Sequence, residues 1–153
     1  MMNKYITLLI ILLTSIGLSA QMEEEMAVKQ TIEDFFAGFH AQDSIKIKAT
    51  VSEGVVMQRV DEKEGGIGEL RTDDFHKFLR GIVSIPKNRK FEEKITSYNI
   101  KVDGAMANAW TGFEFWLDGK ISHCGVNSFQ LYNDGTGWKI FYLVDVGRKE
   151  GCE

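Results

Sequence analysis

The dipeptide Asp118-Gly119, inside a strand-like stretch over residues 105–146, constrains the fold more than any other feature of the sequence. A two-residue type I′ hairpin turn needs positive φ at both central positions, and Asp-Gly accepts this conformation readily. The dipeptide therefore predicts two antiparallel strands joined at this point. A second turn over residues 133–137 predicts a third strand from Trp138 to about Val146.

The hairpin turn also fixes a predicted register. Glu114 then faces His123 across the two strands. Trp110 faces Asn127 in the same register, and the second turn places Tyr142 opposite Asn127. Directly opposed residues point to the same face of a sheet, so these five side chains share one face. Because two intervening glycines leave open space between them, we expect them to line a ligand-binding pocket.

Glu114 and His123 form the sharpest chemical pair of this predicted wall. A carboxylate beside an imidazole raises the pKa of the histidine and orients its ring, so the pair is a candidate catalytic acid/base couple. The plainer interpretation is a cross-strand ion pair that contributes about 0.2–1 kcal/mol to stability. The sequence leaves both interpretations open.

The neighbouring strand introduces a second possibility for the register. Carried back through the turn at Asp103-Gly104, the same pairing places an equally apolar set of residues on the face opposite Trp110. A β-bulge at Gly112 or Gly125 would exchange the two faces partway along the strands. In that case the cavity would be lined by Phe113, Phe115, Ser122 and Cys124.

Residues 1–20 have the layout of a secretory signal peptide. Lys4 supplies a positive start, residues 6–18 are almost continuously apolar, and Ala20 is a small residue at the predicted cleavage site. The apolar run is short for a membrane span, which needs about 20 residues, although a retained N-terminal anchor is the alternative. We therefore expect one domain over residues 21–153, periplasmic or secreted, with no membrane association after cleavage.

Charge and cysteine content narrow the possible partners. The net charge of −4 becomes −5 once Lys4 is removed, so nucleic acid is not an expected partner. Cys124 and Cys152 are too few for a disulfide framework, and either a single bridge or two free thiols fits the sequence. No spacing among Cys, His, Asp and Glu matches a structural metal site, so we expect neither metal nor cofactor.

Helical patterns occupy the first half of the mature chain. A single apolar stripe of Val28, Ile32, Phe35, Phe36 and Phe39 predicts a helix from Met22 to His40. Asp43 or Ser44 can cap a second helix, which ends near Val51, and Thr72 can cap a third, which Pro86 ends. A first strand is expected over residues 55–60, followed by a loop over 61–68, and four strands follow from Phe91. This order predicts an α+β fold in which helices cover one face of an antiparallel sheet.

Several segments resemble the nuclear transport factor 2-like superfamily, and in particular its exported bacterial SnoaL-like and lumazine-binding-like members. The resemblance rests on the helix end at residues 35–43, the strand and turn at 110–119, His123-Cys124-Gly125, and Gly137-Trp138-Lys139-Ile140. It implies a cone-shaped fold in which three N-terminal helices close a curved antiparallel sheet around a cavity. The acid, base and oxyanion residues of ketosteroid isomerase have no positional match here, and neither do the His/Asp pairs of the dehydratases.

These observations favour three functional hypotheses. The first is a binding domain that holds a small, partly apolar molecule in the cone. The second is an enzyme of the isomerase, dehydratase or cyclase type, in which His123 and Glu114 move a proton. The third is an association domain: the chain is expected to form a homodimer through apolar outer residues, namely Phe113, Phe115, Phe141 and Leu143.

Overall fold

The computed structural model describes the backbone of residues 4–152 and the side chains of residues 20–152. The predicted signal peptide lies almost entirely outside the described side chains. The elements are α1 (Lys4–Ala41), α2 (Ser44–Ala49), β1 (Val51–Lys63), η1 (Glu64–Gly66), β2 (Ile67–Asp73), α3 (Phe75–Ser84), β3 (Phe91–Asp103), β4 (Met106–Leu117), β5 (Lys120–Asn133) and β6 (Trp138–Arg148). Within the described residues, no helix is long and apolar enough to cross a membrane.

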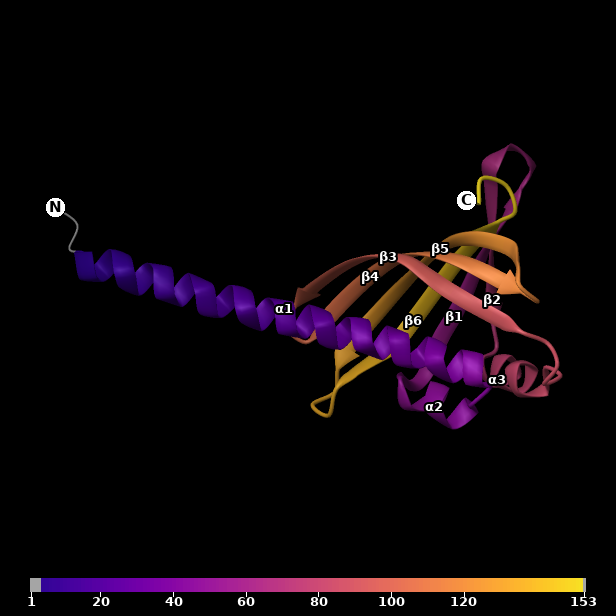
Figure 1. Cartoon of the computed structure of the whole chain (residues 1–153), viewed down its shortest axis with the longest axis horizontal. Coiled ribbons are helices and arrows are strands. Elements are labelled where there is room, and N and C mark those ends of the chain that lie inside the picture. Colours follow the sequence, from indigo (N-terminus) through magenta and orange to yellow (C-terminus); the bar gives the residue numbers. More distant parts are fainter. Residues whose placement is uncertain (1–3, 153) are drawn as a thin grey trace.

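The strands form one curved, six-stranded sheet in the order β2-β1-β6-β5-β4-β3, with α1 lying along one face (Figure 1). The prediction of an all-antiparallel sheet was wrong at one place, because β1 pairs with β6 in parallel. The last strand of the chain inserts between β1 and β5. The strand β2 begins within the predicted loop. Its first six residues are all exposed, so the sequence has no alternating apolar pattern there that would predict a strand.

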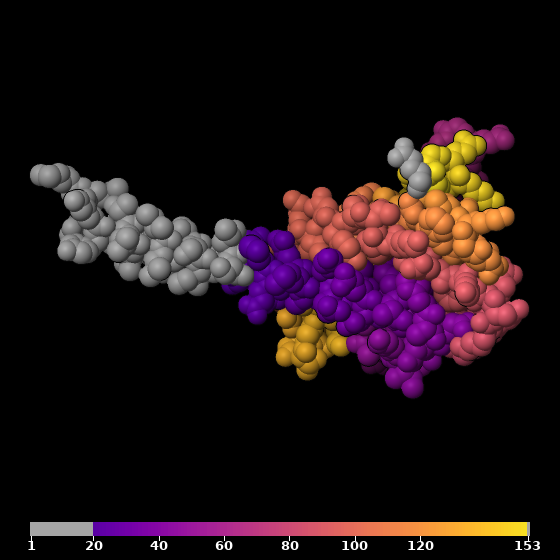
Figure 2. Space-filling view, viewed as in Figure 1, coloured from indigo at the N-terminus to yellow at the C-terminus, as the bar shows by residue number. Residues whose placement is uncertain are grey.

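The predicted apolar stripe of α1 is buried against the sheet. Its five members have exposed fractions between 0 and 8%, and the Phe36 ring lies 6.2 Å from that of Phe129 on β5. The face of the sheet that α1 covers is called the inner face below, and the other the outer face. In Figure 2, α1 and α2 form a continuous surface in front of the strands.

The helix caps differ in one case from the prediction. Asp43 caps α2, and its carboxylate accepts hydrogen bonds from the N–H groups of Ile45 and Lys46. Asp74, rather than Thr72, caps α3. The reason is that Thr72 still belongs to β2, where it pairs with Gln58 of β1.

The predicted hairpin turn is confirmed, since Asp118 and Gly119 have φ angles of 50° and 81°. The register agrees with the prediction only as far as Trp116, which faces Ile121. Ser122 is then an extra residue in β5, so that Phe115 faces His123. This β-bulge lies much closer to the turn than Gly112 or Gly125, where a bulge was considered. Beyond the bulge, every residue of β4 faces a residue of β5 one position further along than predicted. The β5 side chains therefore lie on the opposite face from the predicted one, relative to those of β4.

Candidate functional site

A row of polar side chains crosses the inner face of the sheet. Thr111 of β4 faces Asn127 of β5, Asn127 faces Asp145 of β6, and Asp145 faces Arg59 of β1. Opposed residues point to the same side, so all four lie on the inner face with the core. We call them the polar row. Thr111 and Asn127 are buried, with exposed fractions of 0 and 4%, in a region otherwise filled by apolar side chains.

Glu93 of β3 reaches the polar row from the edge of the sheet. Asn127 donates a hydrogen bond from Nδ2 to Glu93 Oε1, over 2.8 Å. The backbone N–H of Glu93 donates to Nε2 of His40, over 2.9 Å, at the end of α1. Burial lowers the pKa of His40, which favours the neutral ring that can accept this bond. The helix thus binds Glu93 at its backbone N–H, and the sheet binds it at its carboxyl group.

The environment of Glu93 favours its protonated form. Burial raises the pKa of the Glu93 carboxyl group to about 7, and the negative charge of Asp145 adds to this effect. The hydrogen bond from Asn127 and the charge of Arg59 act in the opposite direction. Arg59 is engaged by Asp145, to which it donates from Nε over 2.8 Å and also from Nη2. Glu93 is therefore a proton-holding group beside an ion pair.

One end of the polar row, at Arg59, borders an open cleft of about 290 Å³, and most of the side chains that line this cleft are charged. Its lining includes Arg59, His123 and Gly147. The His123 ring stacks on Phe115 with ring centroids 4.9 Å apart. A Cβ atom at Gly147 would lie 3.1 Å from Cδ2 of His123, so the glycine makes room for the imidazole. Burial lowers the pKa of His123, and the charge of Arg59 lowers it further.

The structure divides the five predicted site residues between the two faces. His123 and Asn127 lie on the inner face, at the cleft and in the polar row. Trp110 lies on the outer face with an exposed fraction of 52%. Tyr142, also on the outer face, pairs with Gln130 and donates from its hydroxyl to Oε1 of Gln58 over 2.6 Å. The extra residue at Ser122 moves His123 and Asn127 to the face opposite Trp110. A second irregularity, where Leu131 faces Ile140 but Gln130 faces Tyr142, moves Tyr142 to the face opposite Asn127.

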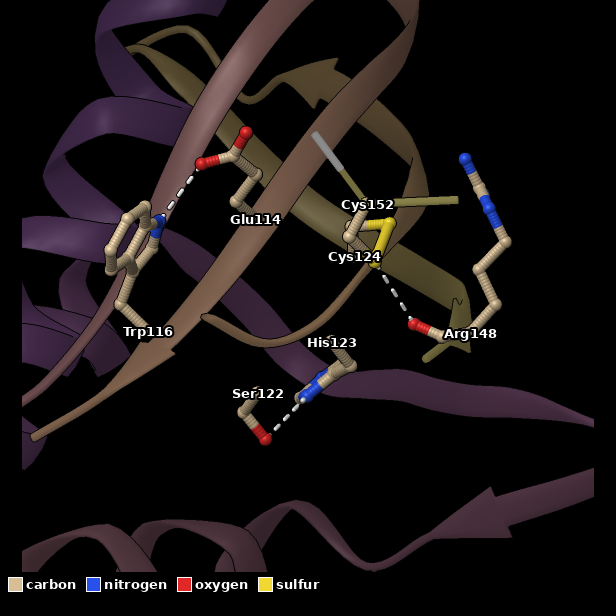
Figure 3. Close-up of a disulfide and its surroundings, with 7 residues drawn as sticks. All are labelled: Glu114, Trp116, Ser122, His123, Cys124, Arg148 and Cys152. Carbon is tan, nitrogen blue, oxygen red and sulfur yellow. Dashed lines mark hydrogen bonds between the residues drawn. A yellow bond between two sulfur atoms is a disulfide. The ribbon is translucent and has the colours of Figure 1, made fainter. Parts of the chain in front are cut away.

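The predicted pairing of Glu114 with His123 was wrong. Glu114 faces Cys124, and its Oε2 accepts a hydrogen bond from the indole N–H of Trp116 over 2.9 Å (Figure 3). His123 instead lies beside Ser122, with Nδ1 and Oγ 3.3 Å apart. Burial and the charge of Arg59 outweigh the opposing charge of Asp145, so the pKa of His123 is lowered rather than raised. The pair therefore has no shared chemistry in this structure.

Cys124 and Cys152 form a disulfide, one of the two states that the sequence left open (Figure 3). Cys124 is buried on β5, and Cys152 lies in the C-terminal tail beyond β6. The bridge therefore ties the tail to the sheet next to Arg148 and Lys149. Arg148 and Lys149 line the cleft at His123, so the bridge also fixes one rim of that cleft.

Glu93, Arg59, Asp145 and His40 were not identified from the sequence as site residues. A usable signal existed for Glu93, because Phe91, Glu93 and Ile95 alternate and therefore share one face of a strand. No comparable signal brings Arg59 to Asp145, since their contact depends on a parallel pairing between distant strands. Among residues 20–152, no group of three or more His, Cys, Asp or Glu is placed to hold a metal ion.

Comparison with known proteins supports the fold. No family model matches the chain, and no curated protein matches it either. Solved structures do match. An NTF2-like protein of unknown function from Shewanella baltica OS155 is 16% identical with a TM-score of 0.60, and the match covers 83% of this chain and 95% of that one. A candidate scytalone dehydratase from Novosphingobium aromaticivorans is 13% identical with a TM-score of 0.65, over 86% and 91% of the two chains.

A third similar structure is a candidate dehydratase of the NTF2-like family from Streptomyces avermitilis. It is 14% identical with a TM-score of 0.63, and the match covers 82% of this chain and 96% of that one. The chain therefore has the nuclear transport factor 2-like fold, as the sequence resemblance implied. At such identities the likeness establishes the fold alone, and the function has to be argued from the site.

Proposed function

We propose that the inner face binds a small, partly apolar molecule, held in a cone between the helices and the sheet. The observation that carries this proposal is the partly buried Glu93 carboxyl group, which accepts a hydrogen bond from the buried Asn127 beside the Arg59–Asp145 ion pair. A protein that needed only stability would place apolar groups here, because burying polar groups is costly.

The polar groups of the site can contact a ligand. Since Oε1 of Glu93 accepts from Asn127, the proton of the neutral carboxyl group belongs on Oε2, which has no hydrogen-bond partner among residues 20–152. The Thr111 hydroxyl is buried and also lacks a partner among the described residues. A buried hydroxyl without a partner normally contacts a ligand or an ordered water molecule, whereas the partly buried Glu93 carboxyl group can also reach solvent. Together they favour a ligand that carries a carbonyl or hydroxyl oxygen.

The cleft limits the size and shape of the proposed ligand. A volume of about 290 Å³ is near the lower end of the range for small-molecule sites, which indicates a compact molecule. The His123 ring lines the cleft and stacks with its other side toward Phe115, with ring centroids 4.9 Å apart. A planar or cyclic molecule with one polar edge fits both features.

One observation favours a second candidate, an acid/base enzyme. General acids and bases work best with a pKa near the operating pH, and the pKa of Glu93 is raised to about 7. In this version Glu93, rather than the predicted pair of His123 and Glu114, moves the proton. Two of the similar folds carry dehydratase names, which is compatible with such chemistry but transfers no activity at this identity.

The test is native mass spectrometry of the mature protein purified from the periplasm of an expressing strain, followed by denaturing extraction of any bound molecule. Stoichiometric occupancy that Asn127→Leu abolishes and Glu92→Gln preserves would support the proposed site. Occupancy unaffected by Asn127→Leu would contradict it. Once a ligand is known, Glu93→Gln separates the candidates, because a binding protein keeps its ligand unchanged whereas an enzyme accumulates unreacted substrate.

We further propose export and homodimerisation. The disulfide supports export to an oxidising compartment such as the periplasm. For the dimer, exposed apolar side chains on the outer face supply a surface, namely Val56, Met106, Trp110, Tyr132 and Phe141. Of the outer residues first expected, Phe113, Phe115 and Leu143 lie on the inner face instead. Sedimentation of Trp110→Glu tests this, and an unchanged oligomeric state would exclude the outer face as the interface.

A further inference from the structure

A second polar cleft lies away from the inner face, between α2 and α3. It has a volume of about 420 Å³ and combines basic, hydroxyl and apolar side chains: Ser44, Lys48, His76, Leu79, Arg80, Val83 and Ser84. No acidic residue lines it. His76 and Arg80 are four residues apart on α3 and therefore lie on the same face of that helix.

The cleft lies in an unusually basic part of an acidic protein. Residues 75–91 contain five Lys or Arg and no Asp or Glu, and residues 44–52 contain two Lys and no acid, whereas the whole chain has a net charge of −4. Lys48 and Arg80 form no ion pair among residues 20–152. Two cations that lack partners at one recess form a positive potential that attracts an anion.

The lining also indicates the shape of that anion. Arg and Lys side chains bind phosphate oxygens strongly, and the serine hydroxyls can donate further hydrogen bonds. The two formal positive charges of Lys48 and Arg80 match the roughly two negative charges of a phosphate monoester. Leu79 is buried with an exposed fraction of 4%, and Val83 is 49% exposed, so an apolar body on the ligand would cover a surface now in water.

The adjoining recess limits the position of the charged group. It shares Lys48 and His76 with the cleft, but its lining also includes the carboxylates of Glu53, Asp73 and Asp74. These carboxylates repel an anion, so the anionic group belongs at the end near Arg80. We propose that the α2–α3 cleft is a binding site for a phosphate monoester with an apolar group, with Lys48 and Arg80 holding the phosphate and Leu79 and Val83 the apolar part.

Isothermal titration of the mature protein with hexyl phosphate and with inorganic phosphate tests this site. We expect hexyl phosphate to bind about tenfold or more tightly than inorganic phosphate, because its alkyl chain would cover the exposed apolar surface of Val83. The double variant Lys48→Gln/Arg80→Gln should weaken hexyl phosphate binding at least tenfold. The matched control is Lys101→Gln/Lys120→Gln, which removes two exposed lysines elsewhere and should change binding less than about twofold.

Each outcome decides the proposal. The proposal is supported if the cleft variant loses binding and the control variant retains it. In NMR spectra of the wild type, hexyl phosphate should then change the amide chemical shifts of α2 and α3 only. Absence of binding, equal loss in both double variants, or no preference for the hexyl compound overturns it. Cosedimentation with phosphatidylcholine vesicles that contain phosphatidic acid distinguishes two possible ligands, a lipid headgroup and a soluble phosphate monoester. Binding to these vesicles that depends on Lys48 and Arg80 identifies a lipid headgroup, and hexyl phosphate binding without it identifies a soluble monoester.

Discussion

Replacing Glu93 by glutamine should change how the stability of the protein depends on pH. In the unfolded chain this carboxyl group titrates near 4.5, and in the folded protein near 7. The folded state therefore binds more protons between these two values, so the free energy of unfolding falls as pH rises through this window. The stabilising protonated form is fully present below about pH 4.5 and is lost above about pH 7.

The magnitude follows from the two pKa values. At 1.36 kcal/mol per pKa unit, the change from 4.5 to about 7 corresponds to about 3 kcal/mol. Glutamine has nearly the same shape, can still accept a hydrogen bond from Asn127, and does not ionise. Glu93→Gln should therefore gain about 3 kcal/mol relative to the wild type between pH 4.5 and pH 7.5.

Urea denaturation of both proteins at several pH values measures this difference. Other groups, such as His40, titrate in the same window, but they contribute to both proteins and largely cancel in the comparison. Glu92→Gln is the matched control, because Glu92 is an exposed neighbour on the same strand, and it should follow the wild type within about 0.5 kcal/mol. A constant difference between Glu93→Gln and wild type would refute the assignment of Glu93 as a proton-holding group.

Three further predictions concern the frame around the site. His40→Ala should lower the free energy of unfolding at pH 7.5 by about 1–3 kcal/mol, measured by urea denaturation, because it leaves the N–H of Glu93 without its acceptor; no loss would contradict this role. Gly125→Ala should prevent folding or cost more than about 3 kcal/mol by the same assay, since its Cβ would overlap the carbonyl oxygen of Val146. Reduction of the disulfide should lower the free energy of unfolding of the wild type by about 2–4 kcal/mol, which a lower thermal midpoint would show. The thermal midpoint of Cys152→Ser should not change with reductant. Equal sensitivity of the two proteins would exclude the bridge as the cause.

Local signals in the sequence predicted most of the fold. The Asp118-Gly119 turn is confirmed because its positive φ angles are a property of two adjacent residues. The apolar stripe of α1 is confirmed because its helical period reflects one continuous contact with the sheet. Both features depend only on neighbours in the chain, and periodicity detects such features well.

The site was harder to predict because it depends on register and on distant pairing. A single extra residue at Ser122 places His123 and Asn127 on the opposite face from Trp110 and Glu114, and nothing in the local sequence marks Ser122 as a bulge. The Glu93 carboxyl group gains its raised pKa from burial that only the complete fold supplies. The sequence predicted that helices cover one face of the sheet, but it did not identify which polar residues lie on that face.

The position of β6 has a consequence for the order in which the protein is made. β6 is the last strand to leave the ribosome, yet it lies between β1 and β5, and its pairing with β1 joins residues that are more than 80 positions apart. Until residues 138–148 have emerged, β1 and β2 have no hydrogen-bonded connection to the other strands. Contacts of such long range are slow to form. Asp145 therefore completes the polar row only at the end of synthesis, and a nascent chain shorter than this lacks the Arg59–Asp145 ion pair.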